Sequence, residues 1–135
     1  MTKNTAKSKV LIAEDETAML LALTDSFESA NFDVLGAKDG EEGLRIALKE
    51  HPHVILIDIV MPKMDGMTML KKLREDDWGK SVPIMILTNL SETEKIAEAM
   101  EDRASDYLIK TDWSLEDIVK KVKKLLKDCP ICQGK

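Results

Sequence analysis

Polar side chains follow four of the short apolar segments in this 135-residue sequence, at the point where each segment ends. They are Glu14 and Asp15 after 9–13, Asp58 after 54–57, Thr88 at the end of 84–88, and Lys110 at the end of 107–110. Asp58 stands out because the run before it, VILI, is entirely apolar, and Pro62 and Gly66 then break the chain into a loop. Carboxylates, a hydroxyl and an ammonium group together are the side chains used to bind a divalent cation and to transfer a phosphoryl group.

The three acids would repel one another by several kcal/mol if they lay close together. A hard divalent cation relieves such repulsion, and oxygen ligands suit Mg²⁺ or Mn²⁺. Thr88 and Lys110 would then hold the oxygens of a phosphoryl group, with Asp58 as the nucleophile. The pattern therefore indicates a magnesium site at which an aspartyl phosphate forms.

Each of these residues also has a purely structural interpretation. Glu14 and Asp15 would cap the helix that follows them and favour its dipole. Asp58 would be a loop acid, Thr88 a strand terminator, and Lys110 a solvated lysine or a simple partner for Asp58. The joint occurrence at four strand ends, rather than any single residue, favours the site.

Hydrophobic patterning predicts five strands that alternate with five helices. The expected strands are 9–13, 33–37, 54–58, 84–88 and 107–110, and the helices begin near 17, 39, 67, 91 and 114. Because these strands have no polar face, we expect a parallel sheet covered on both sides, the doubly wound α/β class with right-handed crossovers. The carboxyl ends of parallel strands share one edge, where such sheets bind ligands.

Helical spacing and capping patterns define the expected helices more closely. Their predicted inner faces are Leu20, Leu23, Phe27 and Ala30; Leu44, Ala47 and Leu48; Leu70 and Leu73; and Leu115, Ile118, Val119, Val122, Leu125 and Leu126. Predicted caps are Asp39 with Glu42, Ser91 with Glu94, and Ser114. The lysines of the last helix occupy mostly its other face.

Bulk properties limit the classes of protein. The length fits one domain, with 1–8 as a flexible arm, 9–127 as the domain and 128–135 as a tail. A formal charge of −5 argues against nucleic-acid binding driven by bulk electrostatics. With no apolar run near the roughly 18 residues of a membrane span and no signal peptide, we expect a cytoplasmic protein without membrane contact. Cys129 and Cys132 form one CxxC, half a zinc site at best, and we interpret them as part of an exposed tail.

The chain resembles the receiver domains of two-component response regulators, including the single-domain chemotaxis type, over 9–127. The segments that carry the resemblance are LIAED, ILIDIVMPKMDG, ILT and YLIK. The resemblance implies strand order 2-1-3-4-5 and phosphorylation of Asp58 by a histidine kinase or a phosphotransfer protein. It implies Mg²⁺ bound by Asp15, Asp58 and the Val60 carbonyl, with Glu14 acting through a metal-bound water.

The resemblance also implies an output. Thr88 and Lys110 would each hold a phosphoryl oxygen, Thr88 would move toward the phosphate, and Tyr107 would turn inward into the vacated space. Without this second duty, Tyr107 is a half-buried strand aromatic. The change would alter the surface formed by the fourth helix, fifth strand and fifth helix, which would contact a downstream protein or a second copy of the chain.

The chain departs from the family pattern in three respects. Thr111 follows Lys110 where relatives usually have proline, and a cis bond before a non-proline costs about 2.5–4 kcal/mol. Asn89 follows Thr88 where relatives have a smaller residue, so it would partly cover the phosphate. Val60 and Leu90 are apolar where relatives carry groups that steer water, and together these changes predict slow dephosphorylation.

Two other functions fit parts of the pattern. A Mg²⁺-dependent phosphatase or mutase with an aspartate nucleophile would carry a second acid two residues after Asp58, where this chain has Val60, and would need length for a substrate cap. A non-phosphorylated interaction domain would have lost one or more of the site groups, which are all present. No nucleotide-binding glycine motif is found, and the absence of a DNA-binding domain predicts output through another protein, unless the chain is part of a longer one.

Overall fold

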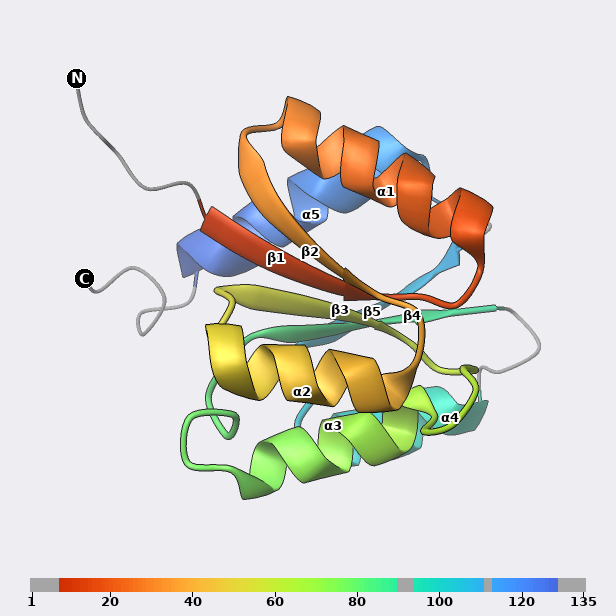
Figure 1. Cartoon of the computed structure of the whole chain (residues 1–135), viewed down its shortest axis with the longest axis vertical. Helices are drawn as coiled ribbons and strands as arrows, with labels where there is room; N and C mark the ends of the chain where they lie inside the picture. Colours follow the sequence, from red (N-terminus) through yellow and green to blue (C-terminus); the bar gives the residue numbers. More distant parts are fainter. Residues whose placement is uncertain (1–7, 90–93, 111–112, 129–135) are drawn as a thin grey trace.

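The computed structural model describes residues 8–89, 94–110 and 113–128 (Figure 1). Its elements in chain order are β1 Ser8–Ala13, α1 Thr17–Ser29, β2 Phe32–Ala37, α2 Gly40–Glu50, β3 Val54–Asp58, α3 Gly66–Glu75, β4 Ile84–Thr88, α4 Glu94–Glu101, β5 Asp106–Ile109 and α5 Leu115–Asp128. The expected alternation of strands and helices is confirmed, with bounds that shift by one or two residues in most elements. The described part of α4 begins at Glu94, and the expected start near residue 91 lies outside the described residues.

The five strands form one parallel sheet in the order β2-β1-β3-β4-β5, which confirms the predicted doubly wound fold. β3 lies at the centre, between β1 and β4, and all five of its residues are buried. Figure 1 shows α1 and α5 on one face of the sheet and α2, α3 and α4 on the other. From β1 the chain goes to β2 on one side and then returns past β1 to β3 on the other side. The carboxyl ends of β1 and β3 are therefore neighbours at the edge of the sheet where ligands bind in this fold.

Each face of the sheet has its own hydrophobic core, because alternate strand residues point to opposite sides. Leu11, Ile55 and Ile57 pack with α2 and α3, whereas Val10, Ile12 and Leu56 pack with α1 and α5. Burial on both faces explains why the strand segments are apolar throughout. The only buried polar or charged side chains in the described part of the chain are Glu14, Asp58, Arg74 and Thr88.

The prediction for α2 was wrong at Leu48, whose side chain is 39% exposed. The buried residues of this helix are Gly40, Gly43 and Ala47, while Leu44 is only partly buried. Small residues let α2 lie close to its neighbours, since a Cβ on Gly43 would be 2.9 Å from Met69 Cε. The inner face is therefore rotated away from Leu48. A hydrophobicity pattern does not reveal this inner face, because two of its buried residues are glycines, which carry no apolar side chain.

The other inner faces agree more closely with the pattern. Leu20, Leu23 and Phe27 are buried in α1, and Leu70 and Leu73 in α3, as predicted. In α5 the central residues Ile118, Val119 and Val122 are buried, whereas Leu115, Leu125 and Leu126 are partly buried. Ala30, the C-cap of α1, is also partly buried.

Two of the predicted helix caps are present. Asp39 Oδ1 accepts a hydrogen bond from the Glu42 N–H at 2.8 Å, and Ser114 Oγ accepts one from the Asp117 N–H at 3.1 Å. Glu42 returns a bond of the capping-box type, because its Oε1 accepts a hydrogen bond at 2.9 Å from the backbone N–H of Lys38. Lys38 is the residue before the N-cap. Ser91 lies outside the described residues.

Arg74, on the buried face of α3, is a structural residue that the pattern did not identify. Its guanidinium donates to the carbonyl oxygens of Gly79 and Val82 at 2.7 and 2.8 Å, and to that of Arg103 at 2.7 Å. Burial and the nearby Arg103 charge lower the pKa of Arg74 to about 10. Arg74 thus ties the α3–β4 loop to the end of α4, and both lie away from the Asp58 edge.

Across the residues that the structure describes, no helix combines the length and apolar character needed to cross a membrane. Cys129, Cys132, Thr111 and Leu90 fall outside those residues.

Candidate functional site

Asp58 is the last residue of β3, at the centre of the carboxyl edge of the sheet. Its side chain is buried, with 5% exposure for the whole residue. The loop that follows is held against the strand, because the Gly66 N–H donates to Ile59 O at 2.8 Å. A Cβ on Gly66 would overlap the carbonyl oxygen of Asp58, so only glycine allows α3 to begin this close to the strand. The tight loop presents the Asp58 carboxylate at the edge.

Glu14 and Asp15 lie beside Asp58, because β1 pairs with β3. One carboxylate oxygen from each of these three residues lies within 4.8 Å of the others, with Glu14 and Asp58 buried and Asp15 exposed. Glu14 Oε2 accepts a hydrogen bond from the Glu16 N–H at 3.0 Å, which fixes its orientation. The structure thus brings the three predicted acids together.

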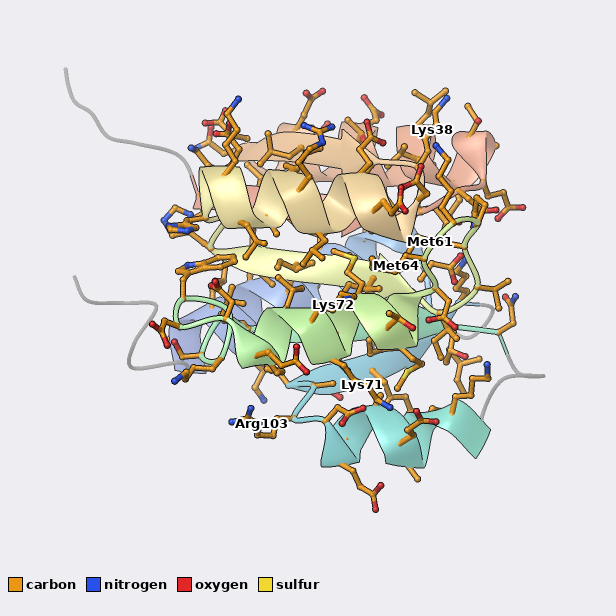
Figure 2. All side chains as sticks on the ribbon, turned by 60° about the horizontal axis from the view of Figure 1, so that its bottom comes forward. Lys38, Met61, Met64, Lys71, Lys72 and Arg103 are labelled. Carbon is orange, nitrogen blue, oxygen red and sulfur yellow. The ribbon has the colours of Figure 1, made fainter. Side chains whose placement is uncertain are left out.

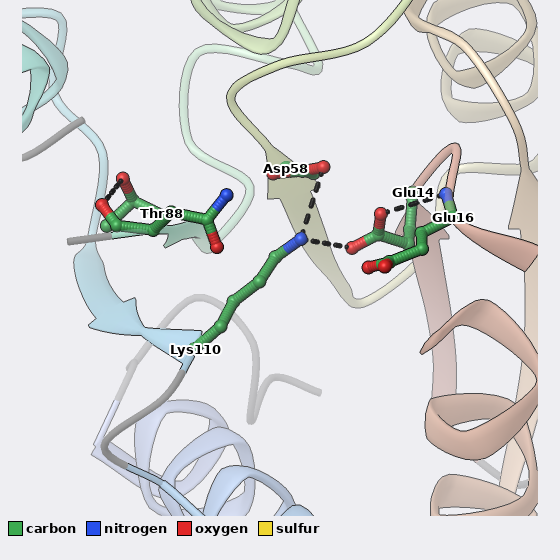
Figure 3. Close-up of polar contacts among 6 residues, drawn as sticks. Glu14, Glu16, Asp58, Thr88 and Lys110 are labelled. Carbon is green, nitrogen blue, oxygen red and sulfur yellow. Dashed lines mark hydrogen bonds and ion pairs between the residues drawn. The ribbon is translucent and has the colours of Figure 1, made fainter. Parts of the chain in front are cut away.

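Lys110 reaches between two of these acids from the end of β5 (Figure 3). Its Nζ lies 2.7 Å from Glu14 Oε1 and 3.2 Å from Asp58 Oδ2. The lysine side chain is 11% exposed and the Glu14 side chain is fully buried. The sequence suggested Asp58 as the simple partner of Lys110, but the shorter contact is with Glu14.

The electrostatics of the cluster oppose ionisation of Asp58. Burial, and then the negative charge of Glu14, raise the pKa of Asp58 to about 7, although Lys110 acts to lower it. Burial alone would lower the pKa of Lys110, but its hydrogen bond to Glu14 and the charge of Asp58 outweigh burial and raise it. Three acids against one lysine leave the site short of positive charge.

Thr88 ends β4 and is fully buried, but its hydroxyl does not bind the acids. Its Oγ1 donates to the carbonyl oxygen of Asn89 at 3.0 Å. Asn89 is exposed at the same edge. Tyr107 lies in β5 and is 38% exposed, which agrees with the half-buried strand aromatic expected from the sequence. The movement of these two residues stays a prediction.

The donor set fits a hard divalent cation, because it consists of closely spaced carboxylate oxygens with excess negative charge. Asp58, Glu14 and Asp15 are the residues that would hold it. Val60 lies two residues after Asp58 in the following loop, with its side chain 50% exposed. Its carbonyl as a further ligand stays a prediction.

Chemically, the site combines a carboxylate at an exposed edge with acids able to bind a cation and a lysine able to neutralise an anion. These are the components of phosphoryl transfer to a carboxylate.

The chain is similar in sequence to transcriptional regulators. It is 31% identical over 119 residues to the DNA-binding dual master transcriptional regulator RpaA of Synechocystis sp., covering 88% of this chain and 49% of that protein. It is 34% identical over 119 residues to the alkaline phosphatase synthesis transcriptional regulatory protein PhoP of Bacillus subtilis, covering 88% of this chain and 48% of that protein. The chain thus spans about half the length of the curated relatives it matches.

Solved structures of similar fold include a receiver domain and a chemotaxis regulator. The receiver domain of the Francisella response regulator 1452 is 33% identical, with a TM-score of 0.81 and coverage of 90% of this chain and 98% of that one. The chemotaxis response regulator CheY4 of Vibrio cholerae is 29% identical, with a TM-score of 0.82 and coverage of 89% and 99%. Residues 10–123 match the family described as the response regulator receiver domain, and the chain belongs to this family.

Proposed function

We propose that the chain is a phosphorylation-activated switch in which Asp58 accepts a phosphoryl group in a Mg²⁺-dependent reaction. The single observation that carries the proposal is the cluster of Glu14, Asp15 and Asp58 within 4.8 Å, with Lys110 3.2 Å from Asp58. The donor is the phosphohistidine of a sensor histidine kinase or a phosphotransfer protein, as family membership suggests.

Asp15, Asp58 and the Val60 carbonyl would ligate the cation directly, and Glu14 would act through a water. Bound Mg²⁺ would supply positive charge that neutralises the acids and the transferred phosphoryl group. The excess of acid over base at the site supports this role, since without a cation the charge on Asp58 is disfavoured.

In the transfer step a carboxylate oxygen of Asp58 forms a bond to phosphorus while the bond from phosphorus to the donor imidazole nitrogen breaks. The electron pair of the broken bond stays on that nitrogen, and the imidazole leaves as a neutral ring because its other nitrogen carries a proton. Lys110 would release one of its acid partners and hold a phosphoryl oxygen. Thr88 would give up its 3.0 Å hydrogen bond to Asn89 O and donate to another.

The movement of Thr88 supports an output through α4, β5 and α5. Tyr107 would turn inward behind Thr88, since it lies on the neighbouring strand and is 38% exposed before the change. The surface of these three elements would then bind a downstream protein or a second copy of the chain. A new charge at one site biases an element that has two arrangements.

A phosphatase with an aspartate nucleophile is less well supported. Its second acid would occupy the position of Val60, whose side chain is apolar and half exposed. The switch therefore accounts for more of the site than the enzyme does.

Incubation with acetyl phosphate and Mg²⁺ tests the switch. We expect a mass increase of about 80 Da, one phosphoryl group, which disappears on chelation of the metal or in Asp58→Asn because the nucleophile is lost. Intact mass spectrometry measures the adduct. Rapid turnover of many phosphoesters would instead indicate the phosphatase, and no adduct in the wild type would contradict both.

Asn89 is expected to lengthen the life of the phosphorylated state. It is exposed beside Thr88 at the edge of the site, where its side chain would limit the approach of water to the phosphoryl group. Asn89→Ala should shorten the phosphoryl half-life several-fold, as followed by loss of the adduct after removal of the donor. Ser81→Ala, an exposed substitution in the α3–β4 loop at the opposite edge of the sheet, is the matched control, and equal half-lives in all three proteins would discard the idea.

A further inference from the structure

The loop between β3 and α3, residues 59–65, is held at both ends by backbone hydrogen bonds. The Ile59 N–H donates to Leu87 O at 3.2 Å, and the Gly66 N–H donates to Ile59 O at 2.8 Å. Within the loop, the Met64 N–H donates to Pro62 O at 2.7 Å, and the Met61 side chain is buried. Because the ends are held, a displacement of one part of the loop must change the backbone positions of its other residues, which include Val60.

A neighbouring element presses on the middle of this loop. The first residue of α2, Gly40, is buried against Met64, and a Cβ on Gly40 would overlap the Met64 carbonyl oxygen and lie 2.8 Å from its carbonyl carbon. These are backbone atoms, so no side-chain rotation can relieve the contact. Figure 2 shows Met61 and Met64 at the end of the molecule where α2 begins, with Met64 between α2 and α3.

An ion pair joins the same two segments at the surface. Asp39, the N-cap of α2, uses Oδ1 to accept from the Glu42 N–H, and its Oδ2 lies 3.7 Å from Lys63 Nζ. Lys63 has a φ of 67°, in the left-handed region. The beginning of α2 therefore contacts two consecutive residues of the loop, one by backbone packing and one by charge.

We infer that Gly40 and the Asp39–Lys63 pair are positioning groups for the cation site, because they set the path of the loop that carries Val60 beside Asp58. Neither group touches the cluster of acids itself. The inference rests on the proposed function, in which the Val60 carbonyl is a cation ligand. Groups that orient ligands from outside the coordination sphere typically change metal affinity by about 10–100-fold when they are altered.

The Gly40→Ala variant tests the inference by Mg²⁺ titration calorimetry. Alanine favours a helix over glycine, and no glycine of the described chain has a positive φ. The nearest contacts that oppose the substitution are therefore those with Met64. We expect a dissociation constant for Mg²⁺ raised about tenfold or more. With acetyl phosphate as donor, the Mg²⁺ concentration for half-maximal phosphorylation should rise, while the rate at saturating Mg²⁺ stays near that of the wild type. Loss of folded protein alone would lower the maximal rate instead.

Gly36→Ala is the matched control, because its Cβ would meet Leu20 Cδ1 at an ordinary 3.6 Å and lies away from the loop. If Gly40→Ala does not fold, Lys63→Met tests the other contact between the two segments, the ion pair with Asp39, at an exposed position. It should raise the Mg²⁺ dissociation constant measurably with an unchanged melting temperature. Wild-type affinity in the variant that is measured, beside a wild type that binds Mg²⁺, would overturn the inference and leave the proposed function intact. A wild type that binds no Mg²⁺ would overturn both.

Discussion

Asp58→Asn is expected to be more stable than the wild type above neutral pH when no divalent cation is present. The pKa of Asp58 is raised from 3.8 to about 7 in the folded protein, first by burial and then by Glu14. A raised pKa contributes stability that is fully present below the unfolded value, near pH 4, and is lost as the pH rises through about 7. Asparagine carries no proton to lose, so the variant escapes this loss.

The expected gain in the free energy of unfolding at about pH 8 is of the order of 1–3 kcal/mol. Each tenfold change in proton affinity corresponds to about 1.4 kcal/mol, and solvent screening at the edge of the protein reduces the total. Denaturant unfolding at about pH 4 and pH 8 measures it, and the difference between the two proteins should appear only at the higher pH. Adding Mg²⁺ should then stabilise the wild type and not the variant, since a ligand stabilises the state that binds it. Equal pH dependence in the two proteins would show that Asp58 is not under electrostatic strain.

Lys110→Met is expected to destabilise the protein strongly at neutral pH. The substitution keeps most of the side-chain volume but removes the ammonium group that lies 2.7 Å from the buried Glu14 and 3.2 Å from Asp58. Removing one partner of a buried pair typically costs about 3–5 kcal/mol, because the remaining charge stays buried without compensation. The pKa of Lys110 is raised, so its contribution is fully present below 10.5 and is lost only as the pH rises beyond that value.

Two comparisons separate this effect from a general loss of charge. Lys121→Met removes a lysine from a pair with Asp106 at 3.1 Å, where both side chains are partly exposed, and should change stability by less than about 1 kcal/mol. Lowering the pH below about 7 should reduce the cost of Lys110→Met, since Asp58, whose pKa is raised to about 7, is then protonated. Thermal unfolding measures each effect, and a loss in Lys110→Met no greater than in Lys121→Met would contradict the assignment. Where phosphorylation of this variant persists, its response should still be weakened, because an oxyanion contact is lost.

The fold class, and the approach of the acids and Lys110 to one edge of the sheet, could be predicted from the residue pattern alone. All-apolar strand segments require a sheet buried on both faces, and parallel strands require that their carboxyl ends share an edge. Asp58, Glu14 and Lys110 therefore had to approach one another, whatever the details of packing. The caps at Asp39 and Ser114 were equally readable, because capping depends on residues three apart in the chain.

Contacts between distant segments could not be read from the residue pattern and became visible only in the folded chain. The shorter Lys110 bond to Glu14, rather than to Asp58, follows from how β5 projects its lysine across the edge. The inner face of α2 includes Gly40 and Gly43 and excludes Leu48, because close backbone approach overrode apolar spacing. Arg74 is buried because three carbonyls from two loops converge on it. Such contacts depend on atoms brought together by packing, and a pattern of residue types along one segment contains no record of them.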